Sequence, residues 1–251
     1  ILSARIICMQ NAFGVPYLPV IDSADSHRIC MQNAYPPFMQ EAGQMSASAF
    51  GERMAELLTS TDSVATLMER AAMTATIDAE RMAAAYTAYK KRKGAGSDEN
   101  SQILRSLLVV AGQRDGLKAV QAMQAAAPDF IEISSLVHGW VLSDPSAATN
   151  WFNEQSGDTA EHALGGLVWG LGQRDTAIAK QVFQTLDPQD QQTSASNLAS
   201  SLVGTHGVTA VDSLIEGLSP ELAQKCVTGA TYRIDRRPPA EAVPWLAGKV
   251  A

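Results

Sequence analysis

Basic side chains recur at one position of a repeating pattern in the second half of the chain. Arg114, Arg174, His206 and Arg237 occupy this position, and Ser143 takes it in the remaining copy. Guanidinium groups offer paired N–H donors to a carboxylate. Stacked copies would align these residues along one edge, where they could hold an acidic segment or a C-terminal carboxylate of a partner. The alternative is local pairing with the adjacent turn or aspartate, which is worth about 0–1 kcal/mol when exposed.

Patterns typical of catalysis or of cofactor binding do not occur in the sequence. The four histidines lack the spacing of metal ligands, and Gly165-Gly166 lies in a helical pattern without the strand that precedes a phosphate-binding loop. No nucleophile elbow, zinc pair or cofactor lysine motif is present. We therefore predict no catalytic residue, no metal and no cofactor. A carboxylate pair assembled only by the fold is an alternative that the sequence leaves open. The histidines are His27, His138, His162 and His206.

The elements that would position the basic residues repeat along residues 98–251. Gly112-Gln113-Arg114-Asp115 recurs 60 positions later as Gly172-Gln173-Arg174-Asp175. Five equivalent positions follow at steps of 29 to 32 residues. A small or β-branched residue stands four positions after each, and a large apolar residue stands seven or eight after most of them, which is the spacing of one buried helix stripe. The five positions are Asp115, Asp144, Asp175, Gly207 and Pro238.

A second apolar helix precedes each of these positions, so each unit is predicted to be a helix, a short turn and a helix. Asp at the turn suits a helix N-cap, and Pro145 and Pro239 suit a first helical turn. Such hairpins bury their stripes only by stacking on neighbours. We therefore predict an all-α fold, with an α-solenoid of about five hairpins and a period of about 31 residues. Four tryptophans are interpreted as packing residues, with an aromatic peptide groove as the alternative: Trp140, Trp151, Trp169 and Trp245.

Residues 171–188 resemble the second half of a tetratricopeptide repeat. Ala179, Phe183 and Pro188 take the places of that family's small residue, aromatic residue and closing proline. The chain departs from the family in its shorter period, in its earlier proline and in its missing Trp and Tyr positions. The sequence is therefore similar to a degenerate tetratricopeptide-like or HEAT-like repeat over about residues 100–251. This resemblance implies a superhelix that binds partner proteins or peptides, and it implies no catalysis.

Residues 46–97 are predicted to form a separate helical segment and a linker. Phe50, Met54 and Leu58 share one helix face, and Asp78 is placed to cap a later helix. That helix ends in the basic residues 90–93, which suit a helix C-terminus, and residues 94–97 (Gly-Ala-Gly-Ser) then form a linker. The alternative for the basic cluster is contact with an anionic partner.

Residues 1–45 are predicted to be a largely irregular or short-hairpin arm. Residues 7–12 (Ile-Cys-Met-Gln-Asn-Ala) recur identically as residues 29–34, and each copy ends before a turn signal. Pairing of the two copies would bring Cys8 close to Cys30 and permit a disulfide. We favour an arm that lies along the main body. The alternative is docking to a partner through Phe13, Tyr17, Tyr35 and Phe38.

Composition excludes several classes of protein. Apolar residues make up 46% and charged residues 18%, which is unlike a disordered chain. The net charge of −7 argues against general nucleic-acid binding, and no apolar run is long enough to predict a membrane span. Because the sequence begins at Ile1, we expect a processed or trimmed product, and no cellular location is predicted.

These features favour a non-enzymatic helical-repeat scaffold that binds a protein or peptide. One alternative is an accessory structural subunit of a larger assembly, docked through residues 1–45. Another, from a different class, is an all-helical enzyme with a cleft between residues 46–93 and the repeats.

Overall fold

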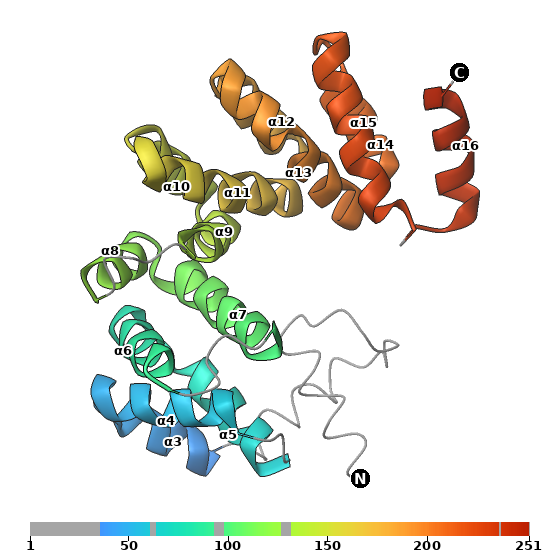
Figure 1. Cartoon of the computed structure of the whole chain (residues 1–251). Helices are drawn as coiled ribbons and strands as arrows, with labels where there is room; N and C mark the ends of the chain where they lie inside the picture. Colours follow the sequence, from blue (N-terminus) through green and yellow to red (C-terminus); the bar gives the residue numbers. More distant parts are fainter. Residues whose placement is uncertain (1–35, 61–63, 93–97, 127–131, 236, 251) are drawn as a thin grey trace. The chain divides into compact units, whose positions relative to one another are not determined.

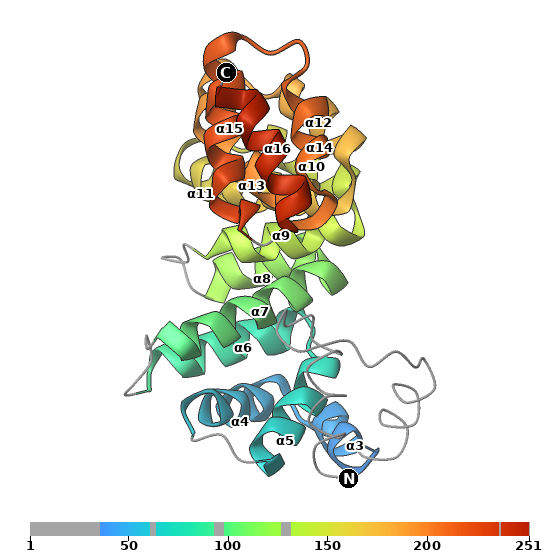
Figure 2. The same ribbon diagram turned by 90° about the vertical axis from the view of Figure 1, so that its right-hand side faces the viewer.

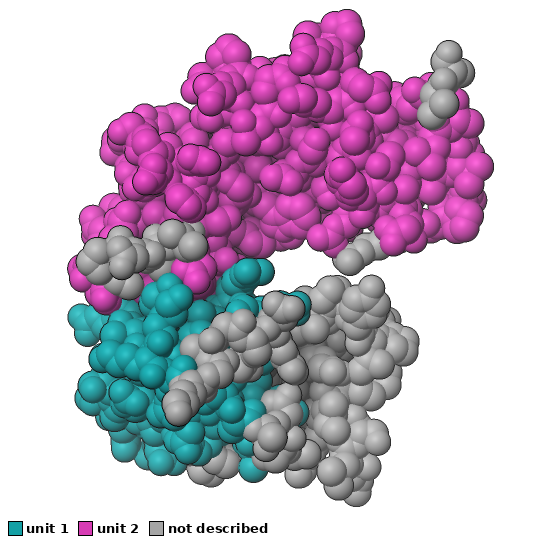
Figure 3. Space-filling model, in the orientation of Figure 1, with its two compact units in different colours: residues 1–107 teal, residues 108–251 magenta. Residues whose placement is uncertain are grey.

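The computed structural model describes residues 36–60, 64–92, 98–126, 132–235 and 237–250. These ranges contain fourteen helices and no strand (Figure 1), so the predicted all-α class is confirmed. The chain divides into two compact units, residues 1–107 and 108–251 (Figure 3). α7 (Asp98–Asp115) crosses the boundary between them. Unit 1 also contains α3 (Pro36–Gln44), α4 (Ala47–Thr59), α5 (Val64–Ala75) and α6 (Ala79–Lys90).

Unit 1 is built around the packing of α4 against α6. Phe50, Met54 and Leu58 are fully buried, as their helical spacing predicts. The two helices approach closely at Gly51, where an added Cβ would lie 2.6 Å from the carbonyl carbon of Ala84. Asp78 caps α6 as predicted, because its carboxylate accepts a hydrogen bond of 2.9 Å from the backbone N–H of Arg81.

Residues 36–44, at the end of the predicted N-terminal arm, form α3. Residues 1–35 lie outside the described residues, so a largely irregular or short-hairpin arm stays a prediction there. Two prolines open this helix, where a fixed φ and a missing N–H are tolerated. Its C-terminal end is held from a distant part of the sequence. The Arg81 guanidinium donates hydrogen bonds of 2.9 and 3.2 Å to the carbonyl oxygens of Gly43 and Met45. Because these hydrogen bonds join residues more than 35 positions apart, the local sequence pattern could not predict them.

Unit 2 contains two layers of helices. α9, α11, α13 and α15 pack on one another in that order, while α10, α12 and α14 lie along one side of this row (Figure 2) and α16 packs against α14. α8 contacts α9. The bounds are α8 (Leu117–Ala126), α9 (Ile133–Ser143), α10 (Pro145–Asn153), α11 (Gly157–Arg174), α12 (Thr176–Thr185), α13 (Pro188–His206), α14 (Val208–Ile215), α15 (Pro220–Ile234) and α16 (Pro239–Val250).

The helix starts in unit 2 follow the predicted capping chemistry. Asp144 and Asp175 cap α10 and α12, each accepting hydrogen bonds from backbone N–H groups of the first turn. Pro188, which takes the place of the closing proline in the resemblance to a tetratricopeptide repeat, is the first residue of α13, and Pro220 is the first residue of α15. Proline at this position ends one unit and begins the next helix at the same time.

The predicted apolar stripe is buried throughout unit 2. All five small or β-branched positions are buried: Ala119, Ala148, Ala179, Val211 and Ala242. Large apolar side chains are buried eight residues after the first three turn positions and seven residues after the last two: Met123, Phe152, Phe183, Leu214 and Trp245. The stripe therefore supplies the contact between the two layers.

Glycine permits close approach of α9 to α7 and of α11 to α9. A Cβ added to Gly139 of α9 would overlap the carbonyl oxygen of Val109 of α7, and one added to Gly166 of α11 would overlap that of Ser134 of α9. Ser201 of α13 donates a hydrogen bond of 2.7 Å to the carbonyl oxygen of Trp169. Small residues at these points let backbones meet directly, so the row is narrow and its outward-facing side chains lie close together.

Candidate functional site

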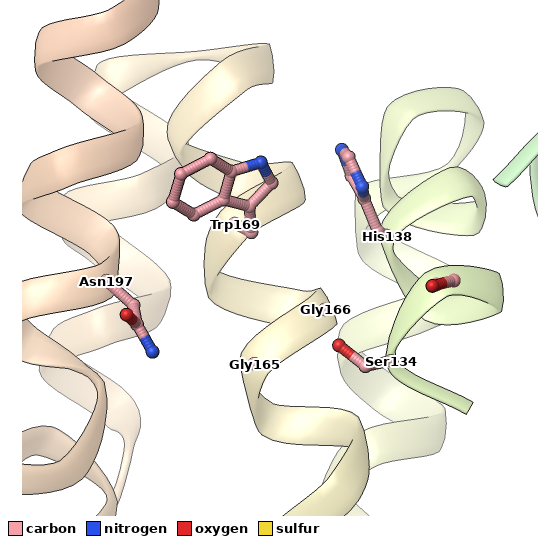
Figure 4. A pocket seen from close by; sticks show the side chains of 7 residues that line it. Ser134, His138, Gly165, Gly166, Trp169 and Asn197 are labelled. Carbon is pink, nitrogen blue, oxygen red and sulfur yellow. The ribbon is translucent and has the colours of Figure 1, made fainter. Parts of the chain in front are cut away.

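An open depression of about 270 Å³ lies on the row formed by α9, α11 and α13 in unit 2. Three helices that are neighbours in the row but not in the sequence contribute to it, so no single segment of the sequence contains the site. Figure 4 shows Trp169 and His138 on opposite sides of the depression. The lining residues are Ser134, Ser135 and His138 from α9, Gly165, Gly166 and Trp169 from α11, and Asn197 from α13.

Two adjacent glycines line the depression on α11, and they have different roles. Gly166 permits close packing, because a Cβ there would overlap the Ser134 carbonyl oxygen. Gly165 has no such constraint, since an added Cβ would meet only the Ser134 Oγ, at 3.4 Å. Glycine inside a helix costs about 0.5–1 kcal/mol relative to alanine. Glycine at position 165 therefore lowers helix stability although packing does not require it there. The space left by its missing side chain is part of the depression.

The polar groups of the depression are uncharged and available. The side chains of Ser134, Ser135, Asn197 and Trp169 make no hydrogen bond to any other part of the described chain. Together they offer two hydroxyls, one amide and one indole N–H. None of the lining residues is a carboxylate, a lysine or an arginine.

His138 adds a neutral imidazole to this lining. Burial lowers the pKa of His138, and its hydrogen bond to Gln173 only partly opposes that shift. The Nε2 atom lies 3.0 Å from the Oε1 atom of Gln173. An oxygen acceptor at this distance places the proton on Nε2, which leaves Nδ1 as a hydrogen-bond acceptor. His138 is therefore a fixed polar group rather than a charged one.

Trp169 is also in contact with an arginine from a distant helix. The guanidinium carbon of Arg233, near the end of α15, lies 5.2 Å from the centroid of the Trp169 ring. This is the geometry of a cation–π interaction. Trp169 is thus a surface residue of the depression, unlike Trp140 and Trp245, which are buried as the packing interpretation predicts.

The predicted basic column lies at the helix ends of unit 2. Arg114, Arg174 and His206 end α7, α11 and α13 and are exposed. Arg237 instead forms an ion pair of 3.3 Å with Glu241, whose carboxylate also accepts a hydrogen bond from the backbone N–H of Val208.

A carboxylate of the chain itself lies beside two members of this column. Backbone hydrogen bonds from Ile178 and Ala177 lower the pKa of Asp175, and the charges of His206 and Arg174 add to that shift. The two basic residues therefore already have an acidic neighbour. Partner binding by the column stays a prediction.

The other predicted site residues have varied placements. Phe13, Tyr17, Tyr35, Cys8 and Cys30 lie outside the described residues, and Phe38 belongs to α3. Cys226 of α15 is a buried free thiol. Among the described residues, no group of three or more His, Cys, Asp or Glu side chains is arranged to hold a metal ion. No described helix combines the length and apolarity that a membrane span needs.

No protein-family model, curated protein or solved structure matches this chain. The likeness to tetratricopeptide or HEAT repeats therefore depends on the sequence pattern and on the all-helical packing of the described residues.

Sequence reasoning missed most of the depression. Gly165 was noted in the sequence only because Gly165-Gly166 does not fit a phosphate-binding loop. Ser134, Asn197 and Arg233 were not singled out. One signal was available: a glycine at a position that helical spacing places away from the buried stripe has no packing reason to be glycine. That signal includes Gly165, but it also includes Gly43, Gly204 and Gly248, where an added Cβ meets nothing within 4 Å. It does not identify which side chains surround Gly165.

Proposed function

We propose that unit 2 is a degenerate tetratricopeptide-like or HEAT-like α-solenoid with a period of about 31 residues. Contacts between residues about one period apart support this arrangement. Ser201 bonds to the Trp169 carbonyl oxygen, 32 residues earlier, and the Glu241 carboxylate accepts from the Val208 N–H, 33 residues earlier. Ser196 donates to the carbonyl oxygen of Lys225, 29 residues later. Two of these contacts join α13 to α11 and to α15, and the third joins α14 to α16, which is the spacing expected of stacked helix pairs.

We infer that this solenoid is a non-enzymatic scaffold, and that an extended peptide segment of a partner protein binds in the depression on α9, α11 and α13. The observation that carries this proposal is Gly165. Its missing side chain keeps open a space that the helix packing does not need, and unpartnered polar groups surround that space.

The lining chemistry suits a peptide backbone. The amide of Asn197 can accept from one peptide N–H and donate to a peptide carbonyl at the same time. Trp169 offers apolar area together with an N–H donor, a combination enriched at protein interfaces. Enclosed small-molecule sites have volumes of about 300–1,000 Å³, whereas this depression holds about 270 Å³ and opens to solvent. A segment lying across the row fits that shape better than an engulfed small molecule.

The proposal is tested by selecting peptides from a displayed random library with the full chain. We expect enriched peptides that bind with micromolar affinity. Gly165→Gln fills the depression with an uncharged side chain and should weaken their binding at least tenfold. Gly248→Gln is the matched control, because Gly248 also lies within a helix and an added Cβ there meets nothing within 4 Å. A library that yields no enriched peptide, or equal binding by the Gly165→Gln protein, would overturn the proposal.

A further inference from the structure

The contact between Arg233 and Trp169 joins two helices that are not neighbours in the row. Trp169 belongs to α11 and Arg233 to α15, and α13 packs against both of these helices. Asn197 of α13 is exposed and lines the depression together with Trp169. The Arg233–Trp169 contact therefore lies beside the depression and connects the helices on either side of α13.

The Arg233 guanidinium has no acidic partner among the described residues. Other arginines of the chain do have one. Arg53 pairs with Glu69 at 2.6 Å, Arg92 with Glu52 at 3.3 Å and Arg237 with Glu241 at 3.3 Å. Arg233 is thus a cation held against an aromatic face, with its N–H donors uncommitted.

The contact with the Trp169 ring also restricts where these donors can lie. A guanidinium that lies against a ring keeps its planar set of N–H groups free at its edge, where a carboxylate can accept two of them. Because the side chain is already positioned by the ring, less rotamer entropy is lost when such a bond forms. The lining residues of the depression carry no carboxylate, lysine or arginine, so Arg233, which contacts the lining residue Trp169, would give a ligand bound there its charge preference.

We propose that the peptide segment bound in the depression carries an acidic side chain that pairs with Arg233 beside Trp169. This inference rests on the peptide-binding function proposed above and specifies its partner as an acidic, extended segment. The cation that this inference assigns to partner binding is Arg233, which differs from the basic residues at the turns that the sequence predicted. Arg233 lies within α15, whereas Arg174 and His206 end their helices beside Asp175.

The same library selection tests this inference separately from the proposed function. We expect the enriched peptides to share an Asp or Glu at one fixed position. Changing that residue to Gln or Asn in the peptide should weaken binding to the wild-type chain about tenfold, and this penalty should shrink at high salt. With Arg233→Gln the penalty should disappear, while Arg233→Lys should retain part of it.

The outcomes are distinguishable. Enriched peptides that lack a common acidic residue, or an acidic preference that persists in Arg233→Gln, would refute the inference and leave peptide binding intact. No enrichment at all would remove both proposals. Circular dichroism and thermal unfolding of each variant exclude a folding defect. Lys118→Gln serves as the control for a loss of positive charge elsewhere on unit 2, because Lys118 is exposed on α8. An equal loss of the penalty in Lys118→Gln would assign the effect to general charge and would also refute the inference.

Discussion

Trp245 donates a hydrogen bond of 2.9 Å from its indole nitrogen to the Asp212 carboxylate. The same carboxylate oxygen lies 2.7 Å from the Lys249 ammonium group, which in turn lies 5.7 Å from the centroid of the Trp245 ring. Asp212 belongs to α14 and the other two residues to α16. This carboxylate therefore fastens the last helix of the chain to the one on which it packs.

We expect Asp212→Ala to lower the free energy of unfolding by about 1–2 kcal/mol, because it removes one charge-assisted hydrogen bond and one partly exposed ion pair. Asp212→Asn should cost less, since its amide oxygen can still accept from the indole. Urea denaturation measures both. Glu216→Ala is the control: Glu216 pairs with Lys180 but its side chain is 82% exposed, so its removal should change stability by no more than about 0.5 kcal/mol. Equal losses at Asp212 and Glu216 would contradict the role given to Asp212.

Substitution of the two adjacent glycines of α11 should have opposite effects on stability. Gly165→Ala should stabilise unit 2 by about 0.5–1 kcal/mol, because alanine is a better helix former and its Cβ has room. Gly166→Ala should destabilise it by about 3 kcal/mol, since the Cβ overlaps the Ser134 carbonyl oxygen and forces α9 and α11 apart. Thermal and urea unfolding of the two variants provide the measurement. The interpretation of the depression fails if the two substitutions shift stability in the same direction.

His138 should make stability fall in mildly acidic solution. Burial lowers the pKa of His138 below the ordinary histidine value of about 6.5, so the unfolded chain binds a proton at a pH where the folded chain does not. Stability is therefore greatest above about pH 6.5 and decreases as the pH falls from there toward the folded-state pKa, below which no further loss arises. His138→Gln should remove this slope. The difference between the two proteins in urea midpoints from pH 7.5 to 5 isolates the contribution, and parallel profiles would contradict it.

Cys226 should be unreactive in the folded chain. Burial raises the pKa of its thiol to about 12 and leaves its side chain inaccessible, and only the thiolate reacts readily with disulfide reagents. In a Cys8→Ser, Cys30→Ser background, labelling by a thiol reagent should be slow in buffer and fast in concentrated urea. Rapid labelling of the folded protein would show that α15 opens readily or packs differently.

The helices and their buried faces were predictable from sequence because local chemistry determines them. Asp144 and Asp175 cap helices through their own side chains, and Ala119, Ala148 and Ala179 lie where helical spacing places them. The solenoid arrangement stays a proposal, since periodicity indicates equivalent units without fixing how each one rotates on its neighbour.

Arg233 illustrates why the site was not predictable. Trp140, Leu171 and Leu202 follow one another at intervals of 31 residues and are all buried. The next position in this series is Arg233, which strict periodicity would place in the core. Its neighbour Tyr232 follows Gly139, Gly170 and Ser201 in the adjacent series, and a tyrosine cannot replace small residues at a close approach. Tyr232 is 70% exposed and Arg233 lies over Trp169.

The Arg233–Trp169 contact has a mechanical consequence. Because α13 separates the two helices, the ring and the guanidinium stay together only while three successive helices keep their spacing. Bending unit 2 so as to spread this surface would pull them apart, and a ligand held between them would stiffen the region against such bending. Tension applied along the chain should therefore weaken the binding of a ligand at this contact, so that the affinity for the ligand depends on how strongly unit 2 is bent.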